Sequence, residues 1–403
     1  MLRVLKFGGT SVGTLERIDN VAQIIKKFID AGDKIVAVVS AMSGETNKLL
    51  EYASHFSNDP VKKELDMLLS SGERVTSALL SIALNDMKIK ATSMSGREAG
   101  ITTDDCYTYA RIEHIDTKNL INSLDNSNVI IVAGFQGISK DTSRVTTLGR
   151  GGSDLTAVAL AGALSADVCE IYTDVDGIYT TDPRIEPKAK KLNKISYDEM
   201  LELASLGAKV LQNRSVEMAK KLNVNLISRS SFTPEIEGTL ITKEENIMEK
   251  PVVSGIALDR NQVRVGMYGV ADKPGIASSI FTALADDNIN VDMIVQTVGN
   301  DGKTNLDFTI PTADLESTKK VMEKFQKDTQ DIDYNDSVCK VSIVGVGMKS
   351  HTGVASKAFT ALAKDNINIR IISTSEIKIS MIIEEKYAEL AVRSLHDAYD
   401  LDK

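Results

Sequence analysis

The sequence has no tryptophan, only 3 cysteines and 4 histidines among 403 residues, and no long apolar run. Cys106, Cys169 and Cys339 are far apart, odd in number and outside any metal-binding spacing, so they fit buried thiols in a reducing cytosol. The histidines share no motif and receive no role. No apolar stretch is long enough to span a membrane, and the start lacks the apolar core of a signal peptide. We therefore expect a cytoplasmic protein without a membrane segment.

The chain also lacks an excess of positive charge. Lysine and arginine number 47, aspartate and glutamate 56, and the net charge is −9. This balance argues against general nucleic-acid binding and against binding to an anionic membrane surface. It does not exclude ATP, because a few local cations suffice to bind one small polyanion. The length predicts two or three domains.

The chain opens with a strand, a glycine turn and a helix. Residues 2–7 form an apolar run typical of a β-strand, Gly8-Gly9-Thr10-Ser11 follows, and apolar residues between Leu15 and Ile29 recur at helical spacing. Glycines let backbone N–H groups approach a phosphate, and a helix N-terminus favours negative charge. Lys6, at the end of the strand, can add an ammonium at the same place.

This stretch also has other possible interpretations. A tight turn beside a surface lysine would explain Gly8-Gly9 alone, but the combination with Lys6 and Thr10-Ser11 favours phosphate binding. The stretch is neither a P-loop nor a dinucleotide-binding loop, because it lacks the later lysine and the third glycine.

Residues 1 to about 240 alternate strand and helix patterns. Further strands are predicted at 34–40, 128–133 and 168–173, and helices at 153–166 and 197–222. Such alternation predicts a mainly parallel sheet with helices on both faces. Ligands of such sheets bind at the carboxyl ends of the strands.

The C-terminal part contains an internal repeat after a polar linker at 242–251. Residues 275–290 return in similar form as residues 353–368, and each copy lies in a strand-helix-strand context. The second copy ends before its last strand. We therefore predict that the strand at 251–258 completes it, so that one βαββαβ module is nested inside the other.

Three more stretches carry polar residues at predicted strand or helix ends. Ser40 ends a strand and is either a turn hydroxyl or a ligand contact. Glu73 is either a favourable first-turn acid or a partner for an ammonium. In Thr147-Leu-Gly-Arg-Gly-Gly-Ser-Asp154, the glycines permit close backbone approach and Arg150 offers a planar fork for a carboxylate. The carboxylates between residues 172 and 184 do not have EF-hand spacing, so we predict no metal site there.

These motifs resemble those of the aspartate kinases, in the amino-acid kinase superfamily, and the resemblance covers essentially the whole chain. Lys6-Phe-Gly-Gly-Thr-Ser11 and the 147–154 stretch carry it most specifically. The resemblance implies an α/β amino-acid kinase domain at 1–242 and two ACT-like modules, at 260–335 and at 251–259 with 336–403. ACT domains are small βαββαβ modules that bind amino acids.

The resemblance also implies roles for individual residues. Lys6 and Lys209 would be catalytic cations, although Lys209 taken alone reads as a solvated helix lysine. The ATP site would consist of Lys6, Phe7, Gly8, Gly9, Ser40, Thr173, Asp174, Tyr179, Arg184 and Lys209. The substrate site would consist of Thr46, Glu73, Arg150, Gly151, Gly152 and Ser153. The effector site would consist of Asp272, Ile276, Ala277, Asn290, Val291, Asp292, Gln296, Asn368 and Ile369.

The implied reaction is phosphorylation of the L-aspartate side chain by ATP to give 4-phospho-L-aspartate, the first step of lysine, threonine and methionine biosynthesis. The nucleophile is a carboxylate with an ordinary pKa of ~3.9, so no catalytic base is needed. Cations, backbone amides and a Mg²⁺ ion held largely by ATP would stabilise the transferring phosphoryl group. Lysine, threonine or both would act as feedback effectors, and the ACT-like modules would join at least a dimer.

Two alternatives stay open at this point. A glutamate or acetylglutamate kinase would share the fold, but the Lys6–Ser11 motif and the two ACT-like modules count against it. A non-catalytic amino-acid sensor would not need Lys6, Arg150 and Lys209, which are all retained. For the modules themselves, the alternative is that they only hold the dimer together.

Overall fold

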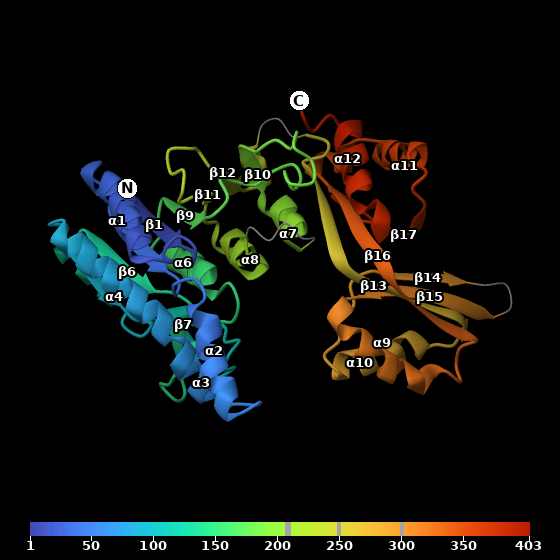
Figure 1. Cartoon of the computed structure of the whole chain (residues 1–403), viewed down its shortest axis with the longest axis horizontal. Helices are drawn as coiled ribbons and strands as arrows, with labels where there is room; N and C mark the ends of the chain where they lie inside the picture. Colours follow the sequence, from blue (N-terminus) through green and yellow to red (C-terminus); the bar gives the residue numbers. More distant parts are fainter. Residues whose placement is uncertain (206–210, 248–250, 299–301) are drawn as a thin grey trace. The chain divides into compact units, whose positions relative to one another are not determined.

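The computed structural model describes residues 1–205, 211–247, 251–298 and 302–403. These residues form two compact units (Figure 1). The first unit contains residues 1–178, 191–204 and 211–247. The second contains the chain from residue 251 onward together with residues 179–190. No helix among the described residues is long and apolar enough to cross a lipid bilayer.

The first unit is built on a mostly parallel sheet, which confirms the predicted fold class. Eight strands of the described chain take part, and β12 and β10 run antiparallel to the other six. In sheet order they are β10 (Lys194–Ser196), β12 (Thr239–Thr242), β11 (Leu226–Ser230), β9 (Val168–Thr173), β1 (Leu2–Phe7), β2 (Lys34–Val39), β6 (Val129–Ala133) and β3 (Ala91–Met94).

Helices cover both faces of this sheet. On one face α1 (Leu15–Asp30) and α4 (Ser71–Asp86) pack together and against β2, and on the other α6 (Gly152–Ala163) packs on β1, β2 and β9. Thr14 caps α1 by accepting from the N–H of Arg17 at 3.3 Å. The remaining helices of this unit are α2 (Glu45–Phe56), α3 (Lys62–Leu69), α5 (Lys118–Asn126), α7 (Tyr197–Ser205) and α8 (Asn213–Leu222).

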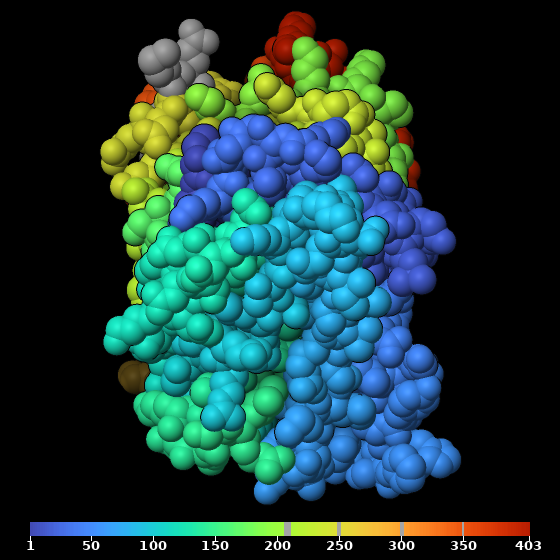
Figure 2. Space-filling view, turned by 90° about the vertical axis from the view of Figure 1, so that its left-hand side faces the viewer, coloured from blue at the N-terminus to red at the C-terminus, as the bar shows by residue number. Residues whose placement is uncertain are grey.

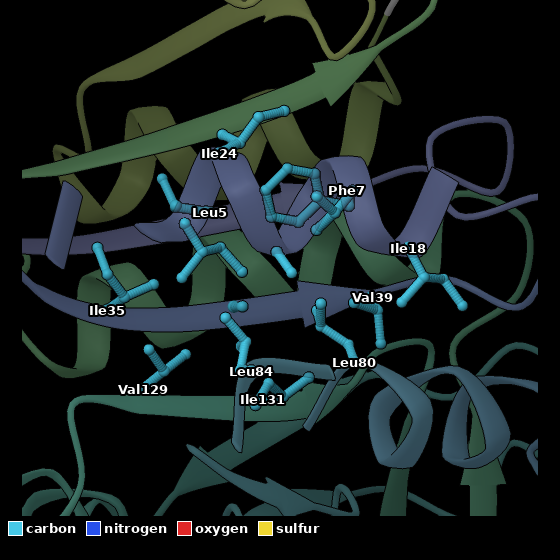
Figure 3. Packing of buried hydrophobic residues seen from close by; sticks show 14 of the residues in the cluster. Leu5, Phe7, Ile18, Ile24, Ile35, Val39, Leu80, Leu84, Val129 and Ile131 are labelled. Atoms are coloured by element: carbon cyan, nitrogen blue, oxygen red, sulfur yellow. The ribbon is translucent and has the colours of Figure 1, made fainter. Parts of the chain in front are cut away.

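The core of the first unit lies between the sheet and the α1–α4 layer. Figure 3 shows Leu5 and Phe7 of β1 packed with side chains of the neighbouring strands and of both helices. Each such side chain stabilises the fold by about 1.5–3 kcal/mol through burial. β1 lies between two parallel neighbours, so an apolar run is expected there. Lys6 is the one charged residue in the buried second half of β1.

A small second sheet accompanies the large one and was not predicted from the sequence. Its strands, in order, are β5 (Ile112–Ile115), β4 (Ile101–Thr103), β7 (Gln136–Ser139) and β8 (Val145–Thr147). Figure 2 shows a face of the first unit that is formed mainly by residues coloured from blue to teal. β8 leads directly into the glycine-rich stretch before α6.

The second unit is a six-stranded antiparallel sheet shared by the two repeated modules. In sheet order the described strands are β14 (Ile294–Val298), β15 (Lys303–Ile310), β13 (Gly255–Ala271), β16 (Asp331–Val344), β18 (Lys378–Glu384) and β17 (Ile369–Thr374). β13 and β16 each run through both modules. The first part of β13 pairs with the second half of β16, from Gly255 opposite Val344 to Asp259 opposite Lys340.

Each module covers its part of the sheet with two helices. In the first module α9 (Ile276–Asp286) and α10 (Leu315–Met322) pack on β13 and β15 around Phe308. In the second, α11 (Val354–Lys364) and α12 (Ala388–Ala398) pack on β16 and β18 around Met381. The segment at 179–190 belongs with this unit through the buried hydroxyl of Thr180, which lies 3.0 Å from Nε2 of His396.

Three local predictions were wrong. The predicted helix at 197–222 is two helices, because Gln212 is extended and α8 begins at Asn213. The strand expected directly after the first repeat copy, residues 275–290, begins only at Ile294. Leu15, placed on the apolar stripe of α1, is 61% exposed because the first turn of that helix extends beyond the core.

Candidate active site

Four adjacent strands of the first unit end at one edge of the sheet. Backbone hydrogen bonds continue the pairing just past their ends: Gly8 N–H to Tyr172 O at 3.1 Å, Ser40 N–H to Phe7 O at 3.1 Å, and Gly134 N–H to Val39 O at 3.0 Å. The segments that follow β9, β1, β2 and β6 therefore form one rim. This is the edge where parallel sheets bind ligands.

Lys6 brings a buried cation to this rim. Its ammonium lies 2.6 Å from Oδ1 of Asp154, and both residues are less than a tenth exposed. A side chain at Gly8 would bring a Cβ within 3.3 Å of the Lys6 Nζ, so the glycine leaves room beside the ammonium. The pair puts a positive charge next to a backbone that a phosphate can approach.

Asp154 was missed as a functional residue in the sequence analysis. The sequence shows it only as an acid in the first turn of α6, which is a common and favourable position. Its contact with Lys6 depends on how α6 packs against β1. A pairing between residues 148 positions apart gives no local pattern, so no signal in a single sequence would have identified it.

The glycine turn after β1 is packed against the segment after β2. A Cβ at Gly9 would lie 3.1 Å from Ala41 O, closer than nearly all real Cβ contacts. On its other side the turn is held by Ser11, whose buried Oγ accepts from Ser231 Oγ at 2.7 Å. Ser11 therefore anchors the turn, whose accessible part is Gly9 and Thr10, whereas Gly8 is buried.

Glu73 enters the same region from the start of α4. It is 4% exposed, and its Oε1 accepts from the Ala41 N–H at 3.1 Å. Its buried Oε2 has no hydrogen-bond partner among the described residues. Burial raises the pKa of the Glu73 carboxyl to about 7. Such a group is suited to bind a cation, which would satisfy the free oxygen.

The stretch before α6 brings Arg150 and Ser153 to the edge. Gly151 has φ +74°, and a Cβ there would lie 2.6 Å from Cγ of Gln212. Ser153 is buried against Gly134, where a Cβ would lie 2.8 Å from the Ser153 Oγ. Arg150 is exposed, so its guanidinium is free to receive an anion from solvent.

The remaining predicted site residues lie in other segments of the chain. Thr46 lies in the first turn of α2, and the Thr173 hydroxyl donates to Asp174 Oδ1 at 3.0 Å. Tyr179 and Arg184 lie in the segment that belongs to the second unit. The Arg184 guanidinium is paired with Asp182 through Nε at 3.0 Å and Nη2 at 2.7 Å. Lys209 lies outside the described residues.

The predicted effector residues lie in the second unit. Asp272 is exposed at the turn before α9, Gln296 is exposed on the edge strand β14, and Asn368 precedes β17. Asp292 forms an ion pair with Lys340, a lysine that is 3% exposed and also lies 3.9 Å from Asp259. Lys340 was not predicted from the sequence, because a lone lysine within a strand pattern carries no distinguishing signal.

Comparison with known proteins agrees with this architecture. The model of the amino acid kinase family matches residues 1–227, and ACT domain models match residues 263–329 and 341–399. The chain is 60% identical over 407 residues to an aspartokinase of Helicobacter pylori strain 26695, with both chains fully covered. It is 53% identical to the aspartokinase of Pseudomonas aeruginosa, covering 98% of that protein.

Solved structures give the same assignment. Crystal structures of E. coli aspartokinase III match with TM-scores of 0.80, in complex with aspartate and ADP, and 0.78, in complex with lysine and aspartate in the T-state. The sequence identities are 26% and 27%, over 98–99% of each chain. With its kinase domain, its paired ACT domains and its full-length relatives, this chain belongs to the aspartokinases of the amino acid kinase family.

Proposed function

We propose that the protein transfers the γ-phosphoryl group of ATP to the side-chain carboxylate of L-aspartate, giving 4-phospho-L-aspartate and ADP. The observation that carries the proposal is the buried ammonium of Lys6 beside Gly8, at the carboxyl edge of a parallel sheet. The membership of the chain among aspartokinases selects aspartate as the acceptor.

In this proposal the glycine turn and Lys6 bind the phosphates of ATP. Gly8 leaves space beside the ammonium, the partly exposed Gly9 would offer a backbone N–H donor, and the ammonium would neutralise charge. Ser40, on the same rim, contributes a hydroxyl. Thr173, the last residue of β9, and Asp174 after it would contact the nucleotide. The family resemblance also assigns Tyr179, Arg184 and Lys209 to ATP, with Lys209 as a phosphate contact.

The aspartate substrate would be held by groups of opposite charge. Arg150 would bind the α-carboxylate through its planar fork, and Glu73 would bind the α-ammonium. Ser153 and the backbone at Gly151 and Gly152 would contact the same molecule. The unpaired Oε2 of Glu73 supports its role, because a buried carboxylate oxygen without a partner is stabilised by an incoming cation.

The chemistry then requires positioning and charge neutralisation. An aspartate Oδ attacks the γ-phosphorus, the bond from phosphorus to the β,γ-bridging oxygen breaks, and ADP leaves. The attacking carboxylate is ionised at neutral pH, so no general base takes part. Lys6 would stabilise the charge on the transferring group, and Asp154 would hold the Lys6 ammonium in place.

Mg²⁺ fits this arrangement as an ion that enters with ATP. The described residues contain no group of three or more metal-ligating side chains, so the phosphate oxygens would provide most of its ligands. When bound, it adds positive charge to the β- and γ-phosphates. The donors that this chain contributes, an ammonium and backbone amides, match the remaining phosphate charge.

The second unit would regulate the reaction by binding an amino acid. A solved aspartokinase III structure contains lysine, and we propose lysine, threonine or both as effectors here. The edge strands β14 and β17 expose Ile294, Val298 and Ile372. Unpaired, apolar sheet edges favour pairing with a second copy, which supports at least a dimer through these modules.

Trapping the acyl phosphate with hydroxylamine tests the reaction directly. The purified protein with ATP, Mg²⁺ and L-aspartate should form aspartyl hydroxamate and release ADP in equal amounts. Glutamate and N-acetylglutamate should give little product. Equal turnover of glutamate would support a different amino-acid kinase, and ADP release without hydroxamate from any of the three would contradict acyl-phosphate formation.

A further inference from the structure

The stretch that carries Arg150 is held from outside by three side chains that the proposed mechanism does not use. Asp66 accepts two hydrogen bonds from Thr147, Arg214 Nη1 donates to the carbonyl of Leu148 at 2.6 Å, and Gln212 Nε2 donates to the carbonyl of Arg150 at 2.9 Å. Four consecutive residues, 147–150, thus include three with a dedicated support. Asp66 is the most deeply buried of these three supports.

Asp66 is a fully buried carboxylate on α3. Its Oδ1 accepts from the Thr147 hydroxyl at 2.6 Å, and its Oδ2 accepts from the Thr147 N–H at 2.9 Å and the Thr108 N–H at 3.0 Å. No cation pairs with it among the described residues. Hydrogen bonds to an ionised acceptor are shorter and stronger than neutral ones, so this carboxylate fixes Thr147 tightly.

The backbone around this contact has little freedom. Thr108 has φ +70°, and Gly149 has φ +78°, with a Cβ there reaching 2.6 Å from the ring of Tyr109. Arg214 stacks on the same ring at 4.5 Å and donates to the carbonyl of Ala110 at 3.0 Å. The segments at 108–110 and 147–149 are therefore pressed together, with Asp66 and Arg214 bridging both.

We propose that Asp66 is a positioning residue for aspartate binding, which acts through Thr147 to fix the backbone from which Arg150 reaches the substrate. The inference rests on the proposed role of Arg150. A bidentate guanidinium contact requires the backbone of Arg150 to be fixed, because the exposed side chain itself has several rotatable bonds. Displacement by about 1 Å can cost up to 10²-fold in such a site. Asp66 itself touches no substrate.

The competing explanation is that Asp66 only stabilises the fold. A merely structural residue, when weakened, lowers thermal stability and the fraction of active protein. It leaves the Michaelis constants of the remaining folded enzyme unchanged. A positioning residue changes the aspartate KM selectively, because the ATP-binding turn after β1 has separate supports in Ser11 and Ser231.

The test uses substitutions at Thr147 with a matched control at its neighbour. Thr147→Val removes only the hydroxyl that donates to Asp66, and Thr147→Ser keeps it. Thr146→Val is the control, because Thr146 is the neighbour of Thr147 in β8 and its buried hydroxyl contacts Thr103 Oγ1 of β4, at 2.6 Å, instead of Asp66. Thr147→Val should raise the aspartate KM about tenfold and the ATP KM by less than about twofold. Thr147→Ser and Thr146→Val should keep both KM values near those of the parent.

Asp66→Asn answers the same question if Thr147→Val fails to fold, because it removes the charge at nearly constant size. It should raise the aspartate KM as well, and the double variant with Thr147→Val should be no worse than the stronger single variant, since both act through one contact. Equal KM changes in the Thr146 and Thr147 valine variants, or unchanged aspartate KM in Thr147→Val and Asp66→Asn, would overturn the inference.

Arg150→Ala separates this inference from the proposed function. If Arg150→Ala raises the aspartate KM while Thr147→Val and Asp66→Asn do not, the role of Arg150 stands and only the role of Asp66 fails. If Arg150→Ala changes the ATP KM alone, the assignment of Arg150 to aspartate is wrong and the role of Asp66 fails with it.

Discussion

Nζ of Lys6 lies 2.6 Å from Oδ1 of Asp154, and each residue is less than a tenth exposed. The lysine is the second-last residue of β1 and the aspartate lies in the first turn of α6, so the pair joins this strand to the helix that packs on it. Removing one member of a buried ion pair leaves the other charge uncompensated. The pair therefore matters for stability as well as for its proposed part in phosphoryl transfer.

Lys6→Ala should lower kcat by about 10²- to 10³-fold, because it removes a cation from the place where charge develops in the transition state. It should also lower the free energy of unfolding by about 3 kcal/mol, because Asp154 is left unpaired. Steady-state kinetics and denaturant unfolding measure the two effects.

A double variant separates stability from catalysis. Lys6→Met with Asp154→Asn removes both charges at similar volume, so it should recover most of the lost stability while staying inactive. Near-parental kcat in folded Lys6→Ala would rule out the catalytic role. Recovery of activity in the double variant would show that stability alone had limited the single variant.

Arg150→Lys should raise the aspartate KM more than the ATP KM. Lysine keeps the positive charge but loses the planar, two-point contact with a carboxylate. We expect an increase of about tenfold for aspartate, equivalent to about 1.4 kcal/mol of binding. Initial rates with each substrate varied in turn give both constants, and a change confined to ATP would show that Arg150 binds the other ligand.

Aspartate binding should depend on pH through Glu73. Burial raises the pKa of this carboxyl to about 7, and an ammonium partner binds only its ionised form well. The aspartate KM should therefore fall as the pH rises from about 6 to about 8 at saturating ATP and Mg²⁺. Glu73→Gln should raise the KM and remove this dependence, and a parallel pH profile in both proteins would assign the titration to another group.

The same shift predicts how stability changes with pH. Folded Glu73 keeps its proton up to a pKa of about 7, and the unfolded chain releases it near the ordinary value of 4.5. Between these values the folded state binds more protons, so the free energy of unfolding falls as pH rises. The loss is at most about 3 kcal/mol. The free energy of unfolding, measured for the parent and for Glu73→Gln at about pH 5 and pH 8, should fall with pH by this additional amount only in the parent.

Gln296→Ala should relieve inhibition by an amino-acid effector and leave uninhibited activity unchanged. Gln296 is exposed on the edge strand β14, where the resemblance places the effector. Thr297→Ala is a suitable control, because Thr297 is also exposed and points to the opposite face. Titration of full-length enzyme with lysine, threonine and methionine measures the effect. Unchanged inhibition in Gln296→Ala would remove this residue from the effector site.

Much of the fold could be predicted because its determinants are local. The apolar run at 2–7, the glycines after it and the helical spacing from residue 15 each follow from short-range patterns. The internal repeat identified the two modules in the same way. The four-stranded sheet was missed because its strands have three or four residues each, too few to show a period.

The site was predictable only where it has a contiguous motif. Lys6, Gly8 and Arg150 belong to such motifs, and the structure brings Lys6 and Gly8 into contact range. Asp154, Lys340 and Asp66 act through partners far along the chain, so only tertiary packing reveals them. The placement of residues 179–190 with the second unit also depends on long-range contacts, such as Thr180 with His396.

One segment of the chain affects whether the two units can be separated by cleavage or truncation. Residues 179–190 follow β9 of the first unit but pack with the second. The Thr180 side chain lies against His396, and the Thr180 carbonyl accepts from the Ile256 N–H at 2.7 Å. A single cleavage near residue 249 would leave this segment covalently attached to one fragment while its packing partners remain in the other. The two fragments should therefore stay associated after limited proteolysis. A gene shortened to its first 242 codons would encode a kinase half with twelve residues deprived of their partners.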